Sequence, residues 1–259
     1  MGFAMDFLAS IDFTALLPFI AVGFAAQMVD GALGMAFGVI SNTLMVGVLG
    51  IPPALASQRV HIVECFTTAT SGISHLIHGN IDKKLFFRLL LPGVAGGVVG
   101  AYVLSSLDAS AVKPWILLYL SGIGLYLLAR GLFYPPKIKE AKHVAPLGLV
   151  GGFLDAVGGG GWGPVVTSNL LIQGADPRKV VGTVNTVEFF LTLTVSATFI
   201  WHLGVADLAG ATLGFLIGGL AAAPFGAWAA KHIPAKAMLI MVGVVLTLTS
   251  LFGAYKAFF

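Results

Sequence analysis

The sequence predicts an all-α fold, a polytopic transmembrane helical bundle made of two inverted-topology repeats. The chain has a mean hydropathy of +0.97, with 58% hydrophobic and only 10% charged residues. A soluble domain would need roughly 25% charged residues to cover its surface. The apolar stretches approach the length of about 20 residues that crosses a bilayer core about 30 Å thick. We therefore expect the protein to lie in a membrane.

Each half of the chain divides into five hydrophobic segments, which we expect to be helices. In the first half they cover residues 11–29, 33–49, 56–78, 85–105 and 112–131. In the second half they cover residues 144–157, 162–173, 181–201, 207–229 and 236–258. The first two segments of the second half are short, so they either span the bilayer or form a re-entrant hairpin. The expected organisation is a first repeat at 1–130, a basic cytoplasmic linker at 131–143 and a second repeat at 144–259.

Corresponding residues in the two halves indicate a duplication of about 125 residues. Ser41-Asn42 recurs as Ser168-Asn169, in each case shortly after a Gly-rich stretch. The stretch from Val60 to Glu64 aligns with the stretch from Val184 to Glu188, so the two glutamates correspond. An odd number of segments per copy makes the second copy enter the membrane upside down, as in many secondary transporters.

The distribution of Lys and Arg supports this odd number. With five segments per copy, one face of the membrane collects eleven of the 14 basic residues: Lys83, Lys84, Arg88, Arg130, Lys137, Lys139, Lys142, Arg178, Lys179, Lys231 and Lys236. The other face keeps Arg59, Lys113 and Lys256. Four segments per copy would give six against eight, which favours neither orientation. Because basic residues favour the cytoplasmic side, both termini are expected on the non-cytoplasmic side.

Two Gly-rich stretches are expected to break the helices: DGALGMAFG, from Asp30 to Gly38, and VGGGGWGPVVTSN, from Val157 to Asn169. Irregular backbone at membrane depth is tolerated only where protein or a water-filled cavity satisfies it. A helix that begins near Pro164 presents N–H groups and the positive end of its dipole, which attract an anion. The candidate substrate-binding residues at these breaks are Ser41, Asn42, Gly158, Gly159, Gly160, Gly161, Trp162, Gly163, Ser168 and Asn169.

Glycine, serine and asparagine in membrane helices also have a purely structural explanation. Small residues allow close packing, and Ser and Asn bond one helix to another without any substrate. Four consecutive glycines, however, would destabilise a packing helix by roughly 1 kcal/mol each. We therefore assign packing to a different set of glycines: Gly96, Gly97, Gly100, Gly218, Gly219 and Gly226.

The third segment of each copy carries polar residues that are costly at membrane depth and therefore functional candidates. Glu64 lies one turn after His61, so the two share a helix face. Glu64, Glu188 and His61 are candidates for proton coupling or gating, although an ion pair or a protonated carboxyl would also explain the glutamates. Arg59 is either an entry-side anion contact or a snorkelling anchor. Asn185 is a further candidate substrate contact.

Two aspartates precede the breaks. Asp30 is a candidate N-cap of the helix after the first break and a candidate coupling or gating residue. Asp155 lies three residues before the Gly run. We expect it to cap or hydrogen-bond the break rather than to meet the substrate.

Other classes of function have no support in the sequence. The histidines sit singly, without the clustering that a metal needs, so no metal site is expected. No nucleophile with its base and orienting group is apparent, and no phosphate loop, so we expect neither an enzyme nor a cofactor. The net charge of +3 does not indicate nucleic-acid binding. The expected partners are a small anion, the lipid bilayer and protons; the sequence does not predict an oligomeric state.

The chain resembles the TauE/SafE family of sulfite and organosulfur anion exporters. The resemblance rests on GGFLDAVGGGGWGPVVTSNLL, from Gly151 to Leu171, and GADPRKVVGTVNTVEFF, from Gly174 to Phe190. It implies a proton-coupled secondary carrier of small sulfur-containing anions, such as sulfite or sulfoacetate, in the cytoplasmic (inner) membrane. In the first half the family pattern expects a G-x-G-G-G-like run, whereas this chain has DGALGMAFG. The site is therefore expected to be asymmetric.

The leading hypothesis is an alternating-access transporter that binds a small oxyanion between the two breaks. A passive anion channel and a carrier of small carboxylates are the alternatives within transport. A membrane scaffold that transports nothing and uses its glycines only for packing is the alternative to transport.

Overall fold

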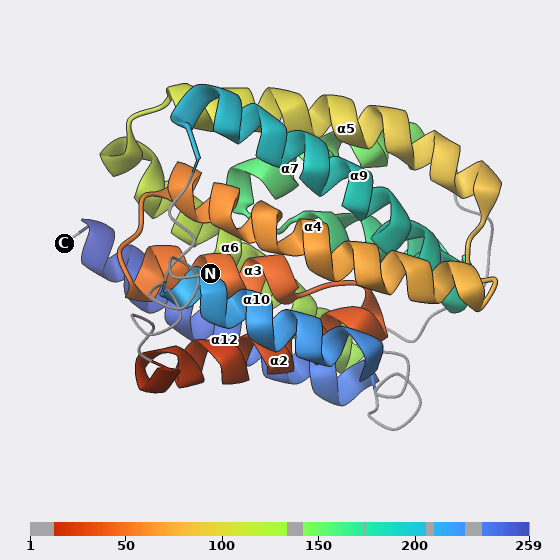
Figure 1. Cartoon of the computed structure of the whole chain (residues 1–259), viewed down its shortest axis with the longest axis horizontal. Helices are drawn as coiled ribbons and strands as arrows, with labels where there is room; N and C mark the ends of the chain where they lie inside the picture. The colour runs from red at the N-terminus through yellow and green to blue at the C-terminus, as the bar shows by residue number, and fades with distance from the viewer. Residues whose placement is uncertain (1–12, 134–141, 174, 206–209, 226–234, 259) are drawn as a thin grey trace, which may run out of the picture.

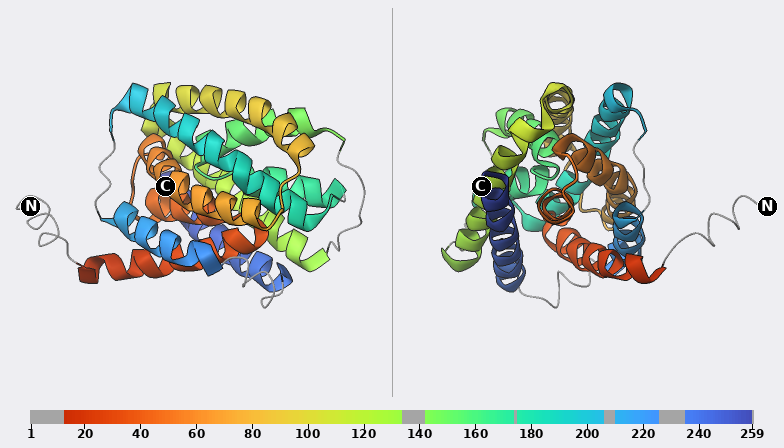
Figure 2. Two further views of the ribbon diagram at one scale, coloured as in Figure 1. Left: turned by 45° about the vertical axis from the view of Figure 1, so that its right-hand side comes forward. Right: turned by 90° about the vertical axis from the view of Figure 1, so that its left-hand side faces the viewer.

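The computed structural model describes residues 13–133, 142–173, 175–205, 210–225 and 235–258, and all its regular secondary structure is helical. The first half contains α2 (Phe13–Leu33), α3 (Phe37–Thr43), the π-helical turn η1 (Leu44–Val48), α4 (Pro53–Ile77), α5 (Lys83–Ser106) and α6 (Ala109–Phe133). The second half contains α7 (Val144–Gly158), the π-helical turn η2 (Gly163–Thr167), α8 (Ser168–Gln173), α9 (Pro177–Leu203), α10 (Ala211–Ala222), the 3₁₀ turn η3 (Ala223–Phe225) and α12 (Ala235–Phe258). The helices run roughly along one long axis (Figures 1 and 2).

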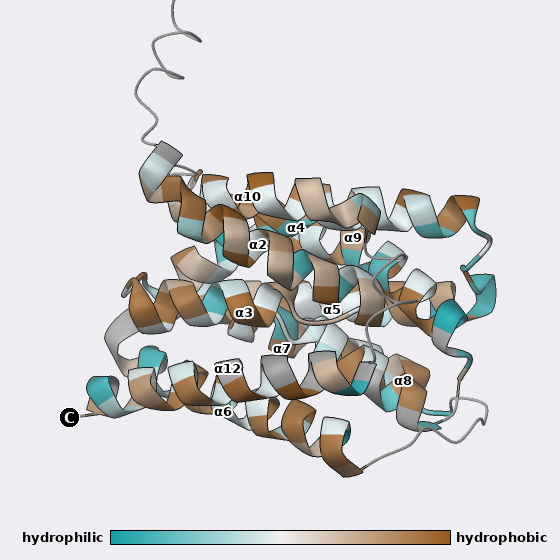
Figure 3. Cartoon of the chain, turned by 90° about the horizontal axis from the view of Figure 1, so that it is seen from below, coloured by the Kyte–Doolittle hydropathy of each residue, from teal (hydrophilic) through white to brown (hydrophobic). Residues whose placement is uncertain are grey.

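Each of the ten predicted segments corresponds to a helix or to a helix with its adjoining short turn, which confirms the all-α prediction. In the described part of the chain, four helices are long and apolar enough to cross a membrane: Thr14–Leu33, Lys83–Ser106, Lys113–Phe133 and Arg178–Leu203. Three shorter apolar helices accompany them: Phe37–Val48, Val144–Gly158 and Ala211–Phe225. Figure 3 shows hydrophobic residues along the helices and many hydrophilic ones near the end where α8 lies. Most of the predicted linker, and Gly226, fall outside the described residues.

Aspartate caps begin two of the long helices at corresponding places in the two halves. The Asp82 carboxylate accepts hydrogen bonds from the N–H groups of Lys84 and Leu85 at the start of α5. The Asp176 carboxylate accepts them from Arg178 and Lys179 at the start of α9, where Pro177 occupies the first helical position. Such caps satisfy N–H groups that have no partner inside the helix.

Hydrogen bonds between helix ends show that α7 and α8 form a hairpin. The N–H group of Lys142, just before α7, donates to Gln173 Oε1 at the end of α8 over 2.7 Å. Arg88, near the start of α5, donates to the Lys142 carbonyl at 3.2 Å. The segment from α7 to α8 therefore enters and leaves at one end of the bundle. The opposite end holds the start of α2 and the end of α12 (Figure 1).

The main helix contacts join the two halves of the chain in pairs. α5 packs against α7, α2 against α10, α4 against α9, and α6 against α12. Glycines allow the closest of these contacts, as predicted for Gly96 and Gly218. A Cβ atom on Gly96 would lie 2.0 Å from the Leu149 carbonyl oxygen, and one on Gly218 would lie 2.1 Å from the Ile20 carbonyl oxygen.

The glycine contact between α5 and α7 gives a first prediction. A Cβ atom on Gly152 would lie 2.1 Å from the Gly93 carbonyl oxygen, so Gly152→Ala should lower the free energy of unfolding by about 1–3 kcal/mol through overpacking. Thermal unfolding in detergent measures the loss. Gly122→Ala in α6 is the matched control, since nothing lies within 4 Å of its Cβ position. Equal melting temperatures for the two variants would contradict the packing.

Candidate functional site at the meeting of two helix breaks

Both Gly-rich stretches break a helix, as predicted. The first break lies between α2 and α3, where Gly34 has φ 67° and Ala36 has φ 119°. The second lies between α7 and η2, where Gly159 has φ 62° and Gly160 has φ 139°. Glycine adopts these angles readily. Ala36 does not, and a non-glycine residue in such a region costs of order 1–3 kcal/mol, as is common at functional sites.

The two breaks touch each other through their backbones. A Cβ atom on Gly160 would lie 2.2 Å from the Val39 backbone nitrogen, and one on Gly163 would lie 2.5 Å from the Gly34 carbonyl oxygen. Any side chain at either glycine would push the breaks apart. This contact between the two halves of the chain, in addition to positive φ, explains why glycines occupy the second break.

The lengths of the short helices place the contact near the middle of the bundle. α3 and η1 have 7 and 5 residues, and η2 and α8 have 5 and 6. At about 1.5 Å per residue, each pair reaches about 17 Å, roughly half of a bilayer core about 30 Å thick. From the breaks, α3 with η1 and η2 with α8 run toward opposite ends of the bundle. The first pair leads to the start of α4, and the second leads to the start of α9.

Asp155 holds the second break in its irregular shape. Its Oδ1 atom accepts hydrogen bonds from the N–H groups of Gly161 at 2.8 Å and Trp162 at 2.9 Å. Its backbone carbonyl accepts one from Gly160 at 3.1 Å. The expected capping role of Asp155 agrees with this geometry. The N–H groups at this helix start were expected to face an anion, but a carboxylate of the chain itself accepts hydrogen bonds from two of them.

His61 joins Asp155 to the first half of the chain. Its Nε2 atom lies 3.0 Å from Asp155 Oδ2, and its Nδ1 atom lies 2.7 Å from the Ser57 carbonyl oxygen. Both of these oxygen atoms lie within hydrogen-bond distance of a ring nitrogen. Ser57 Oγ donates to the Ala156 carbonyl at 2.6 Å. A buried His–Asp pair therefore links α4 to α7.

Asp30 occupies the corresponding position before the first break. Its backbone carbonyl accepts a hydrogen bond from the Gly34 N–H group at 2.6 Å, and its carboxyl group bonds the backbone of Phe37. Asp155 and Trp162, also seven residues apart, form a similar bond in the second half of the chain. The prediction of Asp30 as the N-cap residue was wrong in position, because Ala36 is the N-cap of α3. The carboxyl group reaches the first residue of α3, Phe37, from seven residues earlier in the chain.

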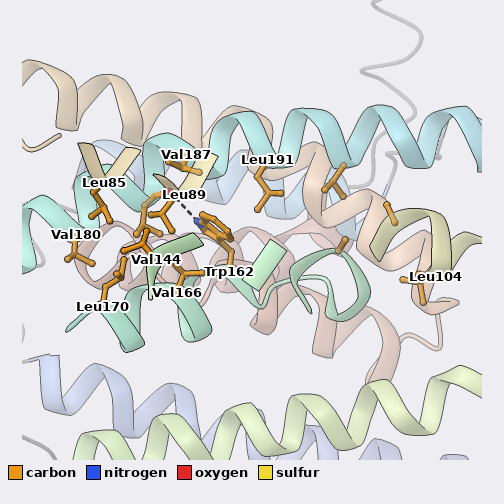
Figure 4. Packing of buried hydrophobic residues seen from close by; sticks show 14 of the residues in the cluster. Leu85, Leu89, Leu104, Val144, Trp162, Val166, Leu170, Val180, Val187 and Leu191 are labelled. Carbon is orange, nitrogen blue, oxygen red and sulfur yellow. Dashed lines mark hydrogen bonds between the residues drawn. The ribbon is translucent and has the colours of Figure 1, made fainter. Parts of the chain in front are cut away.

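Trp162 anchors the second break in the hydrophobic core. Its indole is fully buried among Leu89, Val187 and Leu191 (Figure 4), and its Nε1 atom donates to the Val184 carbonyl at 3.3 Å. In this arrangement Trp162 is packed into the core, so its proposed contact with substrate has no geometric support here. The anchoring instead fixes where the break begins.

Glu64 and Glu188 are both buried beside the breaks. A Cβ atom on Gly38 would lie 2.7 Å from Glu64 Oε1. The Oε2 atoms of both glutamates have no hydrogen-bond partner among the described residues. Asp30, Glu64, Asp155 and Glu188 lie close enough to interact electrostatically. Among the described residues, no group of three His, Cys, Asp or Glu side chains is arranged to hold a metal ion.

The remaining predicted residues divide between the breaks and other helices. Ser41 and Asn42 are buried at the first break, where Ser41 Oγ and Asn42 Oδ1 have no partner among the described residues. Asn169 donates to the Val165 carbonyl of the adjoining π-helical turn at 2.7 Å, and Asn185 donates to Val181 at 3.1 Å. Arg59 is half-buried near the start of α4. The Ser168 side chain lies outside what the structure describes.

Three polar residues beside the breaks were not singled out from the sequence. Thr167 donates to the Gly34 carbonyl at 2.9 Å. A Cβ atom on Gly161 would lie 2.5 Å from the Tyr119 hydroxyl oxygen. Ser57 belongs to the His61 network. Threonine and serine are common in helices. Only knowledge of which face of each helix packs against the breaks could have identified these residues.

The helical fold, its candidate spans and its buried polar breaks define a class, that of polytopic membrane transporters. The chain belongs to the family described as sulfite exporter TauE/SafE, whose model matches residues 19–253. This is a family of transporters and not of enzymes.

Several named relatives are also membrane transporters by description. Over 88% of this chain and 79% of the relative, the sequence is 44% identical to the "Probable membrane transporter protein YtnM" of Bacillus subtilis (strain 168). It is 23% identical to a "Probable membrane transporter protein" of Haemophilus influenzae, over 80% of this chain and 84% of the relative. No solved structure is significantly similar to the chain.

The cap on the second break gives a second prediction. Asp155→Ala leaves the buried N–H groups of Gly161 and Trp162 without an acceptor, which costs about 1–3 kcal/mol for each group. Asp155→Asn keeps an acceptor oxygen and should lose clearly less stability. Thermal unfolding of both variants in detergent measures the difference. An Asp155→Ala protein as stable as the wild type would show that the cap is dispensable.

Proposed function

We propose that this protein is a secondary transporter of a small sulfur-containing anion, such as sulfite, sulfoacetate or a related organosulfonate. The observation that carries the proposal is the meeting of two helix breaks, one from each copy, beside buried polar and ionisable side chains. Irregular backbone at this depth is tolerated only where protein or a water-filled cavity satisfies it, and family membership supplies the class of substrate. The binding groups proposed are Ser41, Asn42 and the backbone of the second break.

We propose that the two copies are inverted repeats that alternate access by rocking against each other. The helix pairing supports this, because exchanging the copies turns the pair of α2 with α10 into the pair of α7 with α5. The same exchange leaves the pairs of α4 with α9 and α6 with α12 unchanged. Separating the breaks would open a path between the copies, as in other inverted-repeat carriers.

The charge of the buried cluster supports coupling to protons. The buried, described ionisable side chains are four carboxyl groups and the imidazole of His61. Several ionised carboxylates in a low-dielectric interior repel one another and any bound anion. Protons on the cluster remove this repulsion, so protons and the anion favour each other's binding. We propose that they are carried together, with Glu64 and Glu188 as the residues that take up protons.

The positions of the helix ends support the proposed orientation in the inner membrane. The starts of α5, α7 and α9 lie at one end of the bundle and carry the basic residues Lys83, Lys84, Lys142, Arg178 and Lys179. The positive-inside rule favours the cytoplasm for this end. The start of α2 and the end of α12 lie at the other end of the bundle (Figure 1). Both termini are therefore proposed to lie outside the cytoplasm.

Reconstitution of the purified protein into liposomes tests the proposed function. We expect uptake of radiolabelled sulfite or of sulfoacetate that an imposed pH gradient drives to accumulation. A passive channel would instead equilibrate the anion and ignore the pH gradient. Small carboxylates transported in preference to every sulfur-containing anion would contradict the proposed substrate class.

The coupling role of the glutamates gives a third prediction. Glu188→Gln keeps the shape of the side chain but cannot exchange a proton, so pH-driven accumulation should fall by at least about tenfold. For comparison, loss of a proton-transfer group in catalysis typically costs about 10²–10⁴-fold. His202→Gln, an exposed change on the same helix, is the matched control. Wild-type accumulation by both Glu188→Gln and Glu64→Gln would exclude these residues from coupling.

A further inference from the structure

Two side chains cross between the breaks in a reciprocal way. Asn42, in α3 of the first copy, donates from Nδ2 to the carbonyl of Gly158 at 2.5 Å, just before the second break. Thr167, in η2 of the second copy, donates from Oγ1 to the carbonyl of Gly34 at 2.9 Å, in the first break. Each copy therefore holds the broken backbone of the other.

The structure pairs Asn42 with Thr167 and not with Asn169. Asp30 and Asp155 are 125 residues apart, and so are Asn42 and Thr167. Matching the letters SN instead pairs Asn42 with Asn169, which is 127 residues away and bonds a carbonyl of its own turn. The two copies place the π-helical turn differently, after α3 in the first and before α8 in the second. The two Ser-Asn pairs therefore do not occupy corresponding positions in the structure.

Both donors are neutral, fully buried and aimed at oxygen. The exposed fraction of Asn42 and of Thr167 is 0%. Their acceptors are backbone carbonyls, which move away with the opposite copy when the breaks separate. A buried donor that loses its acceptor costs free energy, so it favours a replacement oxygen. An amide N–H and a hydroxyl supply that interaction to an anion without adding charge beside the carboxyl cluster.

We propose that Asn42 and Thr167 clamp the breaks together in the closed state and bind the oxygens of the substrate anion when the breaks separate. Donors from opposite sides suit a group with at least two oxygens on one atom, such as sulfite or a sulfonate. Thr167 thereby becomes a substrate-binding residue of the second copy. This inference rests on the proposed function, since it names the groups that recognise the same anion.

Conservative variants of Thr167 test the inference in proteoliposomes. Thr167→Val removes the hydroxyl donor and keeps the shape, so the apparent KM for sulfoacetate should rise about 10- to 100-fold, as expected for a hydrogen bond to a charged group. Thr167→Ser keeps the donor and should stay within about threefold of wild type. Thr247→Val is the matched control, because that buried hydroxyl donates to the Gly243 carbonyl at 2.6 Å within α12.

A second measurement separates substrate binding from a purely structural clamp. Sulfoacetate should raise the melting temperature of the wild type and of Thr167→Ser by mass action, and it should raise that of Thr167→Val much less. Asn42→Leu, which keeps the branched side-chain shape but removes the N–H donors without adding charge, should show the same loss if Thr167→Val fails to fold. A clamp without contact to the anion would change kcat or stability and leave KM unchanged.

The outcomes distinguish this inference from the proposed function. An unchanged KM in Thr167→Val, with normal transport by the wild type, overturns the role of Thr167 and leaves the transporter in place. A wild-type protein that neither transports nor is stabilised by sulfite, sulfoacetate or thiosulfate overturns both. A raised KM in Thr167→Val that Thr167→Ser restores supports both.

Discussion

The structure depends on satisfying irregular backbone where no water is available. At the second break the Asp155 carboxylate accepts hydrogen bonds from two N–H groups, and at both breaks a side chain from the other half of the chain donates to a carbonyl. Backbone groups left unpaired in a membrane interior cost several kcal/mol each. The breaks are therefore stable only in contact with each other or with something that replaces that contact. A bound substrate could replace the contact between the breaks, which makes the space between them a candidate binding site.

The same arrangement gathers charge of one sign. The carboxyl groups that shape the site, together with Glu64 and Glu188, lie within electrostatic reach of one another, and His61 is the one imidazole buried among the described residues. Ionised carboxylates in such a site repel an anion, so protons on them favour its binding. The His61–Asp155 pair joins the two halves of the chain by a hydrogen bond. The residues that stabilise the broken backbone and those proposed for proton coupling therefore belong to one cluster.

Much of the fold could be predicted from the sequence, because lipid demands long apolar helices and broken helices need glycine. The ten segments, the two breaks and the burial of Glu64 and Glu188 were all accessible in this way. The position of Thr167 was not, since the different placement of the π-helical turns shifts the register between the copies. The core position of Trp162 depends on glycines of neighbouring helices, such as Gly93, that pattern reading does not bring together. Tertiary packing decided both.

If the two breaks separate during transport, the groups between them become accessible to water. The reactivity of a thiol at Thr167 tests this separation, with Thr167→Cys as the only cysteine in a Cys65→Ser background, since Cys65 is the single native cysteine. We expect a small water-soluble methanethiosulfonate reagent to modify this buried position under a pH gradient and sulfoacetate to slow the reaction. A Cys at Thr167 that remains unreactive in a protein shown to transport would contradict the separation of the breaks.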